Sequence, residues 1–367
     1  MASIALQRSA VIVGVDTHKD GHVAFAVDGL GGTLGEPCAV PATNAGYEEL
    51  LAWADGLGPV HGFGVEGCGS YGLGLARFLR RHGRRVEEVG RPPRKGERRL
   101  SGKSDALDAE HAARAVLAGV ATSTPKLADG QIEAIRLIKI ARDTAVKAHS
   151  AAMITLKAVL VTASSGQREP LEPLTDYQLI CACAELSTAG SVADPEIAMR
   201  HTLRSLARRW LELHDEIKTH TGHLKTLTRA AAPDLVTVFG VGFDSAAELL
   251  ITAGDNTDRV RSEAAFAKLC GACPIPAGSG KTNGRHRLNR GGNRQANASL
   301  YRIVIVRMRW HPPTIAYVER RTSDGLTKKD IIRCLKRYVA REIYHLLPPP
   351  NTPTDPTATT PTGLDDL

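Results

Sequence analysis

AVIVGVDTHKDGHVAFAVD, residues 10–28, predicts two strands joined by a polar turn. Its first half is a near-continuous apolar run, which is typical of a strand buried on both faces of a sheet. Helical patterns over residues 47–57 and 71–83 then alternate with strand patterns over 60–67 and 84–89. A β-hairpin followed by β/α alternation indicates an α/β domain built on a mixed sheet.

Four carboxylates occupy positions where such a domain collects polar side chains. Asp16 ends the first apolar run and Glu66 ends the second, and sites in open sheets gather at the carboxyl ends of strands. Asp105 and Asp108 lie three residues apart on the first turn of a helix that begins after Ser104, so they share one face. We expect all four to converge if that helix crosses the sheet beside Asp16 and Glu66.

Such a cluster would repel itself unless cations neutralise it. Two Mg²⁺ ions, with Mn²⁺ as a substitute, would satisfy the four carboxylates and stabilise the attacking and leaving oxygens of a phosphoryl transfer. The arrangement is that of an RNase H-like, or RuvC-like, nuclease core. Structural roles are the alternative: Asp16 and Glu66 could accept backbone hydrogen bonds at their turns, and Asp105 and Asp108 could simply favour a helix N-terminus.

Basic segments point to a polyanionic partner. The 367-residue chain carries a net charge of +8 and has a pI near 9.2, and Lys or Arg bound to phosphates release condensed counterions. Residues 91–103 hold six Lys or Arg against one Glu, and residues 281–309 hold eight and no acid. A solvated basic face would interleave acids, whereas a generally basic proteome would explain the net charge alone. The expected nucleic-acid contacts are Arg94, Lys95, Arg98, Arg99, Lys103, Lys281, Arg285, Arg287, Arg290 and Arg294.

A second phosphate contact is expected at a Gly-Val-Gly turn, Gly240 to Gly242, which joins two short helical patterns within residues 233–255. This is the pattern of a helix-hairpin-helix, whose glycines let backbone N–H groups approach a phosphate without sequence preference. A plain turn between two helices is the alternative.

The region from about 130 to 230 is almost entirely helical in pattern and carries an apolar stripe. The stripe alternates spacings of three and four residues, which is typical of a coiled-coil seam. Because both flanks are strongly polar, we expect it to join copies of the chain into a dimer or tetramer; a helix packed on its own domain is the alternative. The stripe consists of Leu203, Leu206, Trp210, Leu213, Ile217, His220, Leu224 and Leu227, with Met199 extending it backward.

A Gly-rich loop holds Ser279 between Gly278 and Gly280. Its Gly-Ser-Gly-Lys-Thr run looks like the end of a nucleotide-binding P-loop, but Ile275 stands where that loop requires glycine. From the residues alone, Ser279 is a turn serine. The nearby Cys270-x-x-Cys273 pair lacks a second pair at zinc-site spacing, so a zinc site is not expected.

Four parts are expected along the chain: a nuclease domain over 1–125, a helical region over 126–230, a small mostly α-helical C-terminal domain over 231–347, and a Pro-rich disordered tail over 348–367. No run of 18 apolar residues and no signal-peptide cleavage pattern is present. We therefore expect a cytoplasmic protein, nucleoid-associated when it acts, with no membrane partner and with its seven cysteines reduced.

Several motifs together resemble one family. VGVDTHKDGHVAFAVD, VEGCGSYG and KSDALDAEHAARAV are similar to the three acidic motifs of the DEDD transposases of insertion sequence family one hundred and ten. GACPIPAGSGKTNGRHRLNRGGNRQANASLY is similar to the transposase domain at their carboxyl end. The resemblance covers nearly the whole chain to about Leu347, and the combination is far more specific than any one motif.

The resemblance implies a RuvC-like domain, a helical coiled-coil linker and a C-terminal domain that carries a nucleophilic serine. By position, Asp16, Glu66, Asp105 and Asp108 match the metal ligands, and Ser279 matches the nucleophile. In such a family the activity is recombination of double-stranded DNA, directed by a guide RNA that the element encodes. Where the family commonly has a second polar residue this chain has Gly278, so Ser279 is the loop's one serine.

Two other functions compete with this one. A hydrolytic nuclease of the junction-resolvase type would use water at the carboxylates and leave Ser279 idle. A non-catalytic nucleic-acid binder would use its acids only to cap turns. The transposase hypothesis differs from both in requiring Ser279 and the four carboxylates together.

Overall fold

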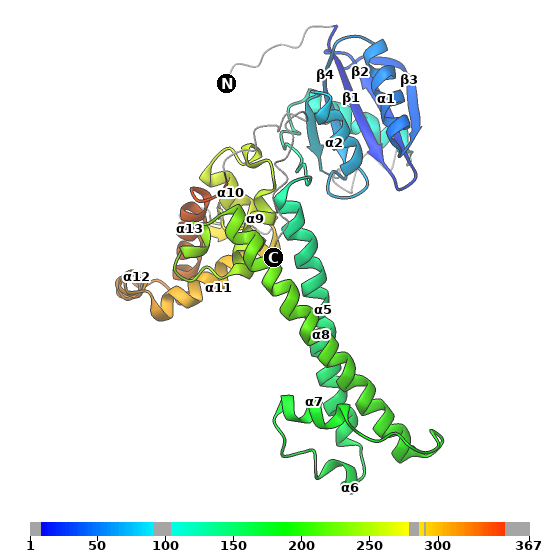
Figure 1. Cartoon of the computed structure of the whole chain (residues 1–367). Coiled ribbons are helices and arrows are strands. Elements are labelled where there is room, and N and C mark those ends of the chain that lie inside the picture. The colour runs from blue at the N-terminus through cyan, green and yellow to red at the C-terminus, as the bar shows by residue number, and fades with distance from the viewer. Residues whose placement is uncertain (1–8, 91–103, 279–285, 290, 349–367) are drawn as a thin grey trace, which may run out of the picture. The chain divides into compact units, whose positions relative to one another are not determined.

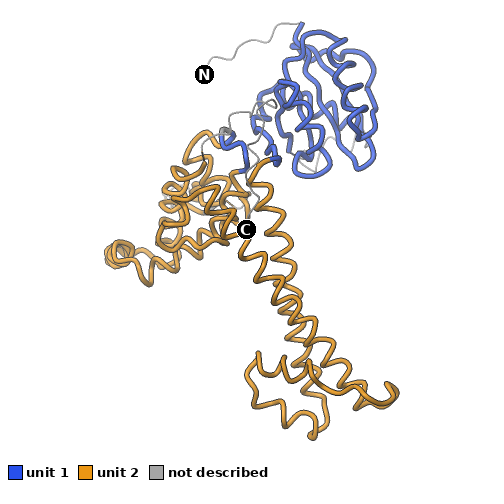
Figure 2. Tube along the Cα trace, viewed as in Figure 1, with its two compact units in different colours: residues 1–129, 254–259, 350–367 blue, residues 130–253, 260–349 orange. Residues whose placement is uncertain are grey.

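The chain divides into two compact units (Figure 2). The computed structural model describes residues 9–90, 104–278, 286–289 and 291–348. The first unit consists of Met1–Asp129, Gly254–Arg259 and Pro350–Leu367, and the second of Gly130–Ala253 and Val260–Pro349, as far as these are described. Gly254–Arg259 belongs to the first unit because the Asn256 side chain accepts from the backbone N–H of Leu127 and donates to the carbonyl of Pro125 (3.1 and 3.0 Å).

A five-stranded mixed sheet forms the centre of the first unit (Figure 1). Its order is β3-β2-β1-β4-β5, in which β1 pairs antiparallel with β2 and parallel with β4. The predictions of a hairpin start, a buried first strand and a mixed α/β sheet are confirmed, and the domain fits an RNase H-like fold. The strands are β1 (Val11–Thr17), β2 (Gly21–Val27), β3 (Thr33–Pro41), β4 (Val60–Glu66) and β5 (Val86–Val89).

Helices cover both faces of this sheet. Alternate residues of β1, Val11, Val13 and Val15, pack into one core with α1 (Asn44–Gly56) and α2 (Leu73–Arg81). The residues between them face α4 (Asp105–Leu117), whose buried alanines pack with Ile12. Because side chains alternate along a strand, Gly14 and Asp16 lie on the α4 face.

Two glycines allow α4 to lie directly on the sheet. A Cβ at Gly14 would lie 2.0 Å from the carbonyl oxygen of Ala109 and 2.2 Å from the backbone nitrogen of Ala113. A Cβ at Gly64, on the neighbouring strand, would lie 2.7 Å from the carbonyl oxygen of Ala112. The backbone of α4 therefore touches the backbone of β1 and β4, which fixes where the helix begins relative to the strand ends.

Two long helices, α5 (Gln131–Val161) and α8 (Pro195–Ala231), run alongside each other in the second unit (Figure 1). Leu203 and Trp210 of the apolar stripe are buried in a core shared with α5 and α7 (Asp176–Ala184), near the short α6 (Ser165–Arg168). Within the described residues the stripe thus packs inside its own chain, which is the alternative noted above, and a coiled coil between copies is not confirmed.

Helix α5 is long and apolar enough, by length and composition alone, to cross a membrane. It also carries Lys139 and Arg142, which form ion pairs with Asp244 (2.7 and 3.3 Å), and it packs along α8. Charges paired with another helix are typical of a helix that packs within a folded domain.

The rest of the second unit is a helical domain with one large core. The core is formed mainly by α9, α10, α11 and α13, and its fully buried side chains include Leu249, Phe266, Leu300 and Ala340. Its elements are η1 (Leu235–Thr237), α9 (Phe243–Ala253), α10 (Glu263–Leu269), β6 (Pro274–Pro276), β7 (His286–Leu288), α11 (Arg294–Trp310), α12 (Pro312–Ser323) and α13 (Lys328–Tyr344); η2 (Thr257–Arg259) lies in the first unit.

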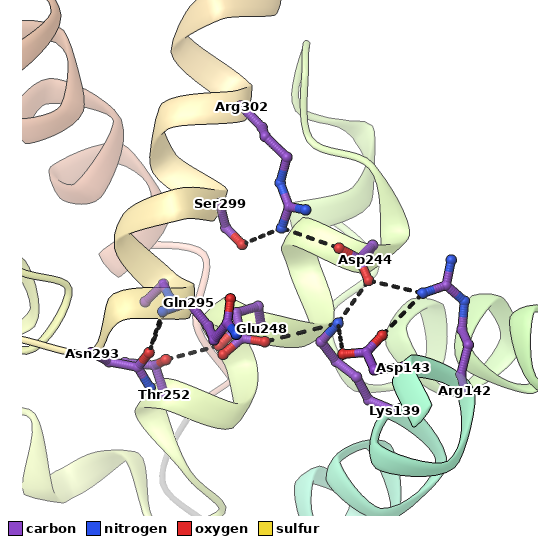
Figure 3. Close-up of polar contacts among 11 residues, drawn as sticks. Lys139, Arg142, Asp143, Asp244, Glu248, Thr252, Asn293, Gln295, Ser299 and Arg302 are labelled. Atoms are coloured by element: carbon purple, nitrogen blue, oxygen red, sulfur yellow. Dashed lines mark hydrogen bonds and ion pairs between the residues drawn. The ribbon is translucent and has the colours of Figure 1, made fainter. Parts of the chain in front are cut away.

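A charged network ties α5, α9 and α11 together (Figure 3). Asp244 at the start of α9 receives Lys139 at 2.7 Å and Arg142 at 3.3 Å from α5, and Arg302 at 3.1 Å from α11. Burial acts to raise the pKa of Asp244, but these cations outweigh it and lower that pKa. Glu248, one turn further along α9, lies 3.9 Å from Lys139, and burial raises its pKa. The network fixes the α9 N-terminus through opposite charges.

Candidate active site

The ends of β1 and β4 bring Asp16 and Glu66 next to each other. The parallel register pairs Val15 with Val65, so the following residues, Asp16 and Glu66, are neighbours across the two strands. Both lie two residues beyond the glycines that touch α4, and hence on the face that α4 covers. The Thr17 hydroxyl donates to the carbonyl of Glu66 (3.0 Å), which ties the strand ends together.

The first turn of α4 supplies two further carboxylates. The Ser104 side chain caps the helix by accepting from the backbone N–H of Leu107, so the helix begins at Asp105. Since Ala109 lies over Gly14, the preceding turn, with Asp105 and Asp108, extends toward Asp16. The helix thus crosses the sheet beside Asp16 and Glu66, which is the arrangement that convergence of the four acids requires.

The electrostatic environment of Asp16 is consistent with this proximity. Asp16 is only 7% exposed, and burial is the main reason why its pKa is raised. The charges of Asp108 and Asp105 raise that pKa further, whereas His18 lowers it. The ionised carboxylate of Asp16 is therefore both desolvated and repelled by two neighbours, and a cation bound there would relieve both effects.

His18 was missed by the sequence reasoning. Its Nε2 lies 3.1 Å from Asp16 Oδ2 and 3.4 Å from Asp105 Oδ1, and the ligand atoms of these three residues lie within 4.8 Å of one another. A signal existed, because His18 follows Asp16 by two residues at the end of a strand and such residues share a face. One ring nitrogen of His18 thus lies close to both Asp16 and Asp105.

Carboxylate oxygens as the main donors suit a hard divalent cation such as Mg²⁺. Among the described residues, the group of Asp16, His18 and Asp105 is the one set of three or more metal-type ligands found, and it contains no cysteine. Burial raises the pKa of Cys270 to about 12, which disfavours the thiolate that zinc would need.

Ser279 lies outside the described residues, as do Lys281, Arg285 and Arg290 and the five expected contacts in the other basic segment (Arg94, Lys95, Arg98, Arg99 and Lys103). Arg287 on β7 and Arg294 at the start of α11 are described, and both are exposed.

The base of the serine loop is firmly anchored. β6 and β7, which flank Ser279 in the sequence, pair as an antiparallel ribbon. A Cβ at Gly292 would lie 2.2 Å from the backbone nitrogen of Gly271, so these two backbones pack directly. Asn297 of α11 donates to the carbonyls of Cys270 and Gly271 (3.0 and 2.9 Å) and accepts from Lys336 of α13 (2.8 Å). Contacts from β7, α11 and α13 thus fix the part of the chain that leads into the loop.

The Gly240 turn differs from the helix-hairpin-helix expectation. The element before it is the three-residue 3-10 helix η1 rather than an α-helix. Gly240 has a φ of 81°, and a Cβ there would lie 3.3 Å from the carbonyl oxygen of Ile303, while Arg307 donates to the carbonyl of Phe239 (2.9 Å). Gly240 is therefore packed against α11, whereas Gly242 is exposed. The helix-hairpin-helix is not confirmed.

Comparison with known proteins agrees with both units. A family model described as "Transposase IS116/IS110/IS902 family" matches residues 232–319, and a DEDD-type IS110 model described as "Transposase" matches residues 13–164. The second match contains Asp16, Glu66, Asp105 and Asp108, and the first contains Ser279.

The chain is also similar to a curated protein of Streptomyces coelicolor, "Insertion element IS110 uncharacterized 43.6 kDa protein". The two are 28% identical over 145 residues, which are 39% of this chain and 36% of the relative, so the similarity spans about a third of that protein's length. With both transposase models matched in order along the sequence, the chain belongs to the IS110 family of DEDD transposases.

Proposed function

We propose that the protein is the transposase of an insertion sequence, which cuts and rejoins double-stranded DNA through a covalent serine–DNA intermediate. The observation that carries the proposal is the buried Asp16 carboxylate beside Asp105 and Asp108. A structural acid would be expected to face donors or cations, whereas this one faces other acids and one histidine. The DEDD-type family match and the acidic cluster together suggest that the protein uses a divalent metal.

Mg²⁺ is the proposed metal, with Mn²⁺ as a substitute, and Asp16, Glu66, Asp105 and Asp108 are the proposed ligands. Bound there, the metal would neutralise charge on a DNA phosphate and favour the alkoxide form of an attacking hydroxyl. The chain's own contribution is geometric: the sheet fixes two carboxylates, α4 fixes two more, and His18 bridges Asp16 and Asp105.

Ser279 is the proposed nucleophile. A serine hydroxyl is a weak nucleophile at neutral pH and needs activation. Its Oγ would form a bond to phosphorus while one P–O bond of the DNA strand breaks, and the serine proton would pass to the departing DNA oxygen. One phosphodiester replaces another, so the bond energy is kept for rejoining. Exposed Arg287 and Arg294, close to Ser279 in the sequence, are proposed to bind the DNA backbone.

A guide RNA encoded by the element and an oligomeric assembly complete the proposal. Both follow from the resemblance, and the basic charge of the chain favours two polyanionic partners. The half-buried members of the α8 stripe, such as Leu213 and Ile217, offer apolar surface for contact between copies.

The decisive experiment compares two variants on a plasmid that carries the element ends, with the guide RNA and Mg²⁺ present. Ser279→Ala should abolish covalent protein–DNA adducts and recombination, and Asp16→Asn should abolish all cutting. Ser150→Ala and Asp20→Asn, both exposed, are the matched controls and should behave as wild type. If wild type and Ser279→Ala both nick DNA with Mg²⁺ but neither recombines it, the protein is instead a hydrolytic nuclease of the junction-resolvase type. Unchanged cutting by Asp16→Asn would refute both functions.

A further inference from the structure

A basic cavity of about 950 Å³ lies in the second unit. One wall is formed by residues of β6 and β7, including Pro274 and Arg287, and the other by the exposed side of α13. The two strands of the first wall are the ones that flank Ser279 in the sequence. Two of its lining residues, Ala277 and His286, are therefore close in the sequence to the proposed nucleophile.

Its α13 wall is a regular stripe of cations. Lys329, Arg333, Arg337 and Arg341 are spaced four residues apart and all line the cavity, so they lie along one face of the helix. Twelve residues of helix span about 18 Å, a length over which one strand of B-form DNA carries about five phosphates. The spacing suits a backbone that runs along the helix.

Acids pair with half of the cations in the lining, which contains six Lys or Arg and a single acid, Asp330. Asp330 pairs with Arg333 at 2.8 Å, Arg321 pairs with Asp324 at 2.9 Å, and Arg341 pairs with Glu263. Lys329 and Arg337 on α13, and Arg287 on the opposite wall, form no ion pair with any acid in the part of the chain that the structure describes. Cations on two facing walls are thus left for a ligand.

An aromatic ring lies among these cations. Tyr338 lines the cavity and is 52% exposed, while the edge-to-face contact with Tyr317 (5.7 Å, 87°) fixes the orientation of its ring. A concave basic surface with an exposed, oriented aromatic ring is typical of proteins that bind unpaired nucleotides, because a base can stack on the ring while the cations hold the phosphates. A duplex keeps its bases stacked inside and cannot use Tyr338 in this way.

We propose that this cavity binds an unpaired nucleic-acid strand, with phosphates along Lys329 and Arg337 and a base stacked on Tyr338. The proposal rests on the proposed function, in that the protein acts on nucleic acid. The strand is either DNA opened at the cutting site or an unpaired part of a guide RNA, since both present the same phosphates and stacked bases.

The test measures Kd by fluorescence anisotropy for the full chain with a 20-nucleotide single-stranded DNA, the same sequence as RNA, and the DNA duplex. Lys329→Ala/Arg337→Ala should weaken binding of the unpaired strand about tenfold or more and reduce the slope of log Kd against log salt by about 1.4. Tyr338→Ala should weaken it as well, and Tyr338→Phe should retain wild-type affinity. The charge-matched control is Lys147→Ala/Lys218→Ala, two exposed residues on α5 and α8.

The larger loss on DNA or on RNA identifies the source of the strand. Equal losses for the cavity and control variants, or a loss confined to duplex, would overturn the inference. Asp16→Asn serves as the reference for the proposed function, because it should bind the strand as wild type does while it fails to cut. If wild type cuts and the cavity variants bind normally, this inference fails and the proposed function stands. If wild type does not cut but the cavity variants still lose binding, the proposed function fails and this inference stands.

Discussion

Adding one methyl group to the sheet should disturb the carboxylate cluster without changing any of its members. In Gly14→Ala the new Cβ would lie 2.0 Å from Ala109 O and 2.2 Å from Ala113 N, both backbone atoms of α4. Ordinary contact begins at 3.4 Å, so the helix must move by the difference between 3.4 and 2.0 Å, about 1.4 Å. A helix backbone cannot yield as a side chain can, and Asp105 and Asp108 move with it.

Two effects of this movement are measurable. Overpacking a buried contact costs about 1–3 kcal/mol, or roughly 4–10 °C in the Tm of the first unit. Catalytic groups tolerate a displacement of only about 0.5 Å, and a misplacement of about 1 Å can cost about 100-fold in rate. Gly14→Ala should therefore reduce the rate of Mg²⁺-dependent cutting about 100-fold while it lowers the free energy of unfolding by only about 1–3 kcal/mol. All four carboxylates and His18 remain in the chain.

A series of alanine variants in the same sheet provides the control. A Cβ at Gly62 would meet its nearest atom at 3.5 Å, which is ordinary contact, and one at Gly64 would meet Ala112 O at 2.7 Å. Thermal melting and plasmid cutting should both rank Gly62→Ala near wild type, Gly64→Ala between, and Gly14→Ala lowest. Wild-type cutting by Gly14→Ala, or an equal loss in Gly62→Ala, would refute the idea that direct backbone contact sets the site.

Three further predictions concern single side chains. Burial raises the folded-state pKa of Glu248 above its unfolded value, so the protein loses stability as pH rises from about 4 through the folded pKa. The Tm of Glu248→Gln should therefore rise relative to the Tm of wild type between pH 4 and 8. A Tm difference that does not change with pH would contradict this. Asn297→Ala removes its hydrogen bonds to two carbonyls and to Lys336 and should cost about 1–3 kcal/mol. It should reduce serine–DNA adducts while Mg²⁺ binding by calorimetry stays unchanged; loss of Mg²⁺ binding would count against the anchor role. Burial and neighbouring acids also raise the pKa of Asp16, so Asp16→Asn should melt at a higher temperature than wild type at pH 7 without metal. Mg²⁺ should raise the Tm of wild type but not the Tm of Asp16→Asn. If Mg²⁺ leaves the Tm of wild type unchanged, metal binding is contradicted.

The sequence predicted the parts of the site that depend on local pattern. Apolar runs that end in Asp16 and Glu66 are readable because a buried strand has few polar positions, and Ser104 marks the start of α4 because capping is a local interaction. The contact between Gly14 and α4 could not be read, since it joins residues about 95 positions apart through backbone atoms alone. His18 was missed for a related reason: its partners are defined only once α4 lies beside β1.

The apolar stripe of α8 shows a different limit. Spacings of three and four specify that a helix buries one face, but they do not specify which surface covers it. In the structure α5 and α7 cover Leu203 and Trp210 within the same chain, while Leu213 and Ile217 remain half-buried. Pairing inside a chain needs no loss of translational freedom, so an available intramolecular partner competes strongly with a second copy.

The arrangement of charge differs between the proposed catalytic cluster around Asp16 and the charged network around Asp244. Asp244 is half-buried and faces Lys139, Arg142 and Arg302, so its environment favours the ionised form and adds to stability. Asp16 is more deeply buried and faces two acids, so its environment opposes the ionised form. Asp16 also lies two residues beyond Gly14, whose backbone contacts the backbone of α4 directly. A protein retains such an unfavourable charge when a ligand offsets it, which supports the proposal that a divalent metal binds at Asp16.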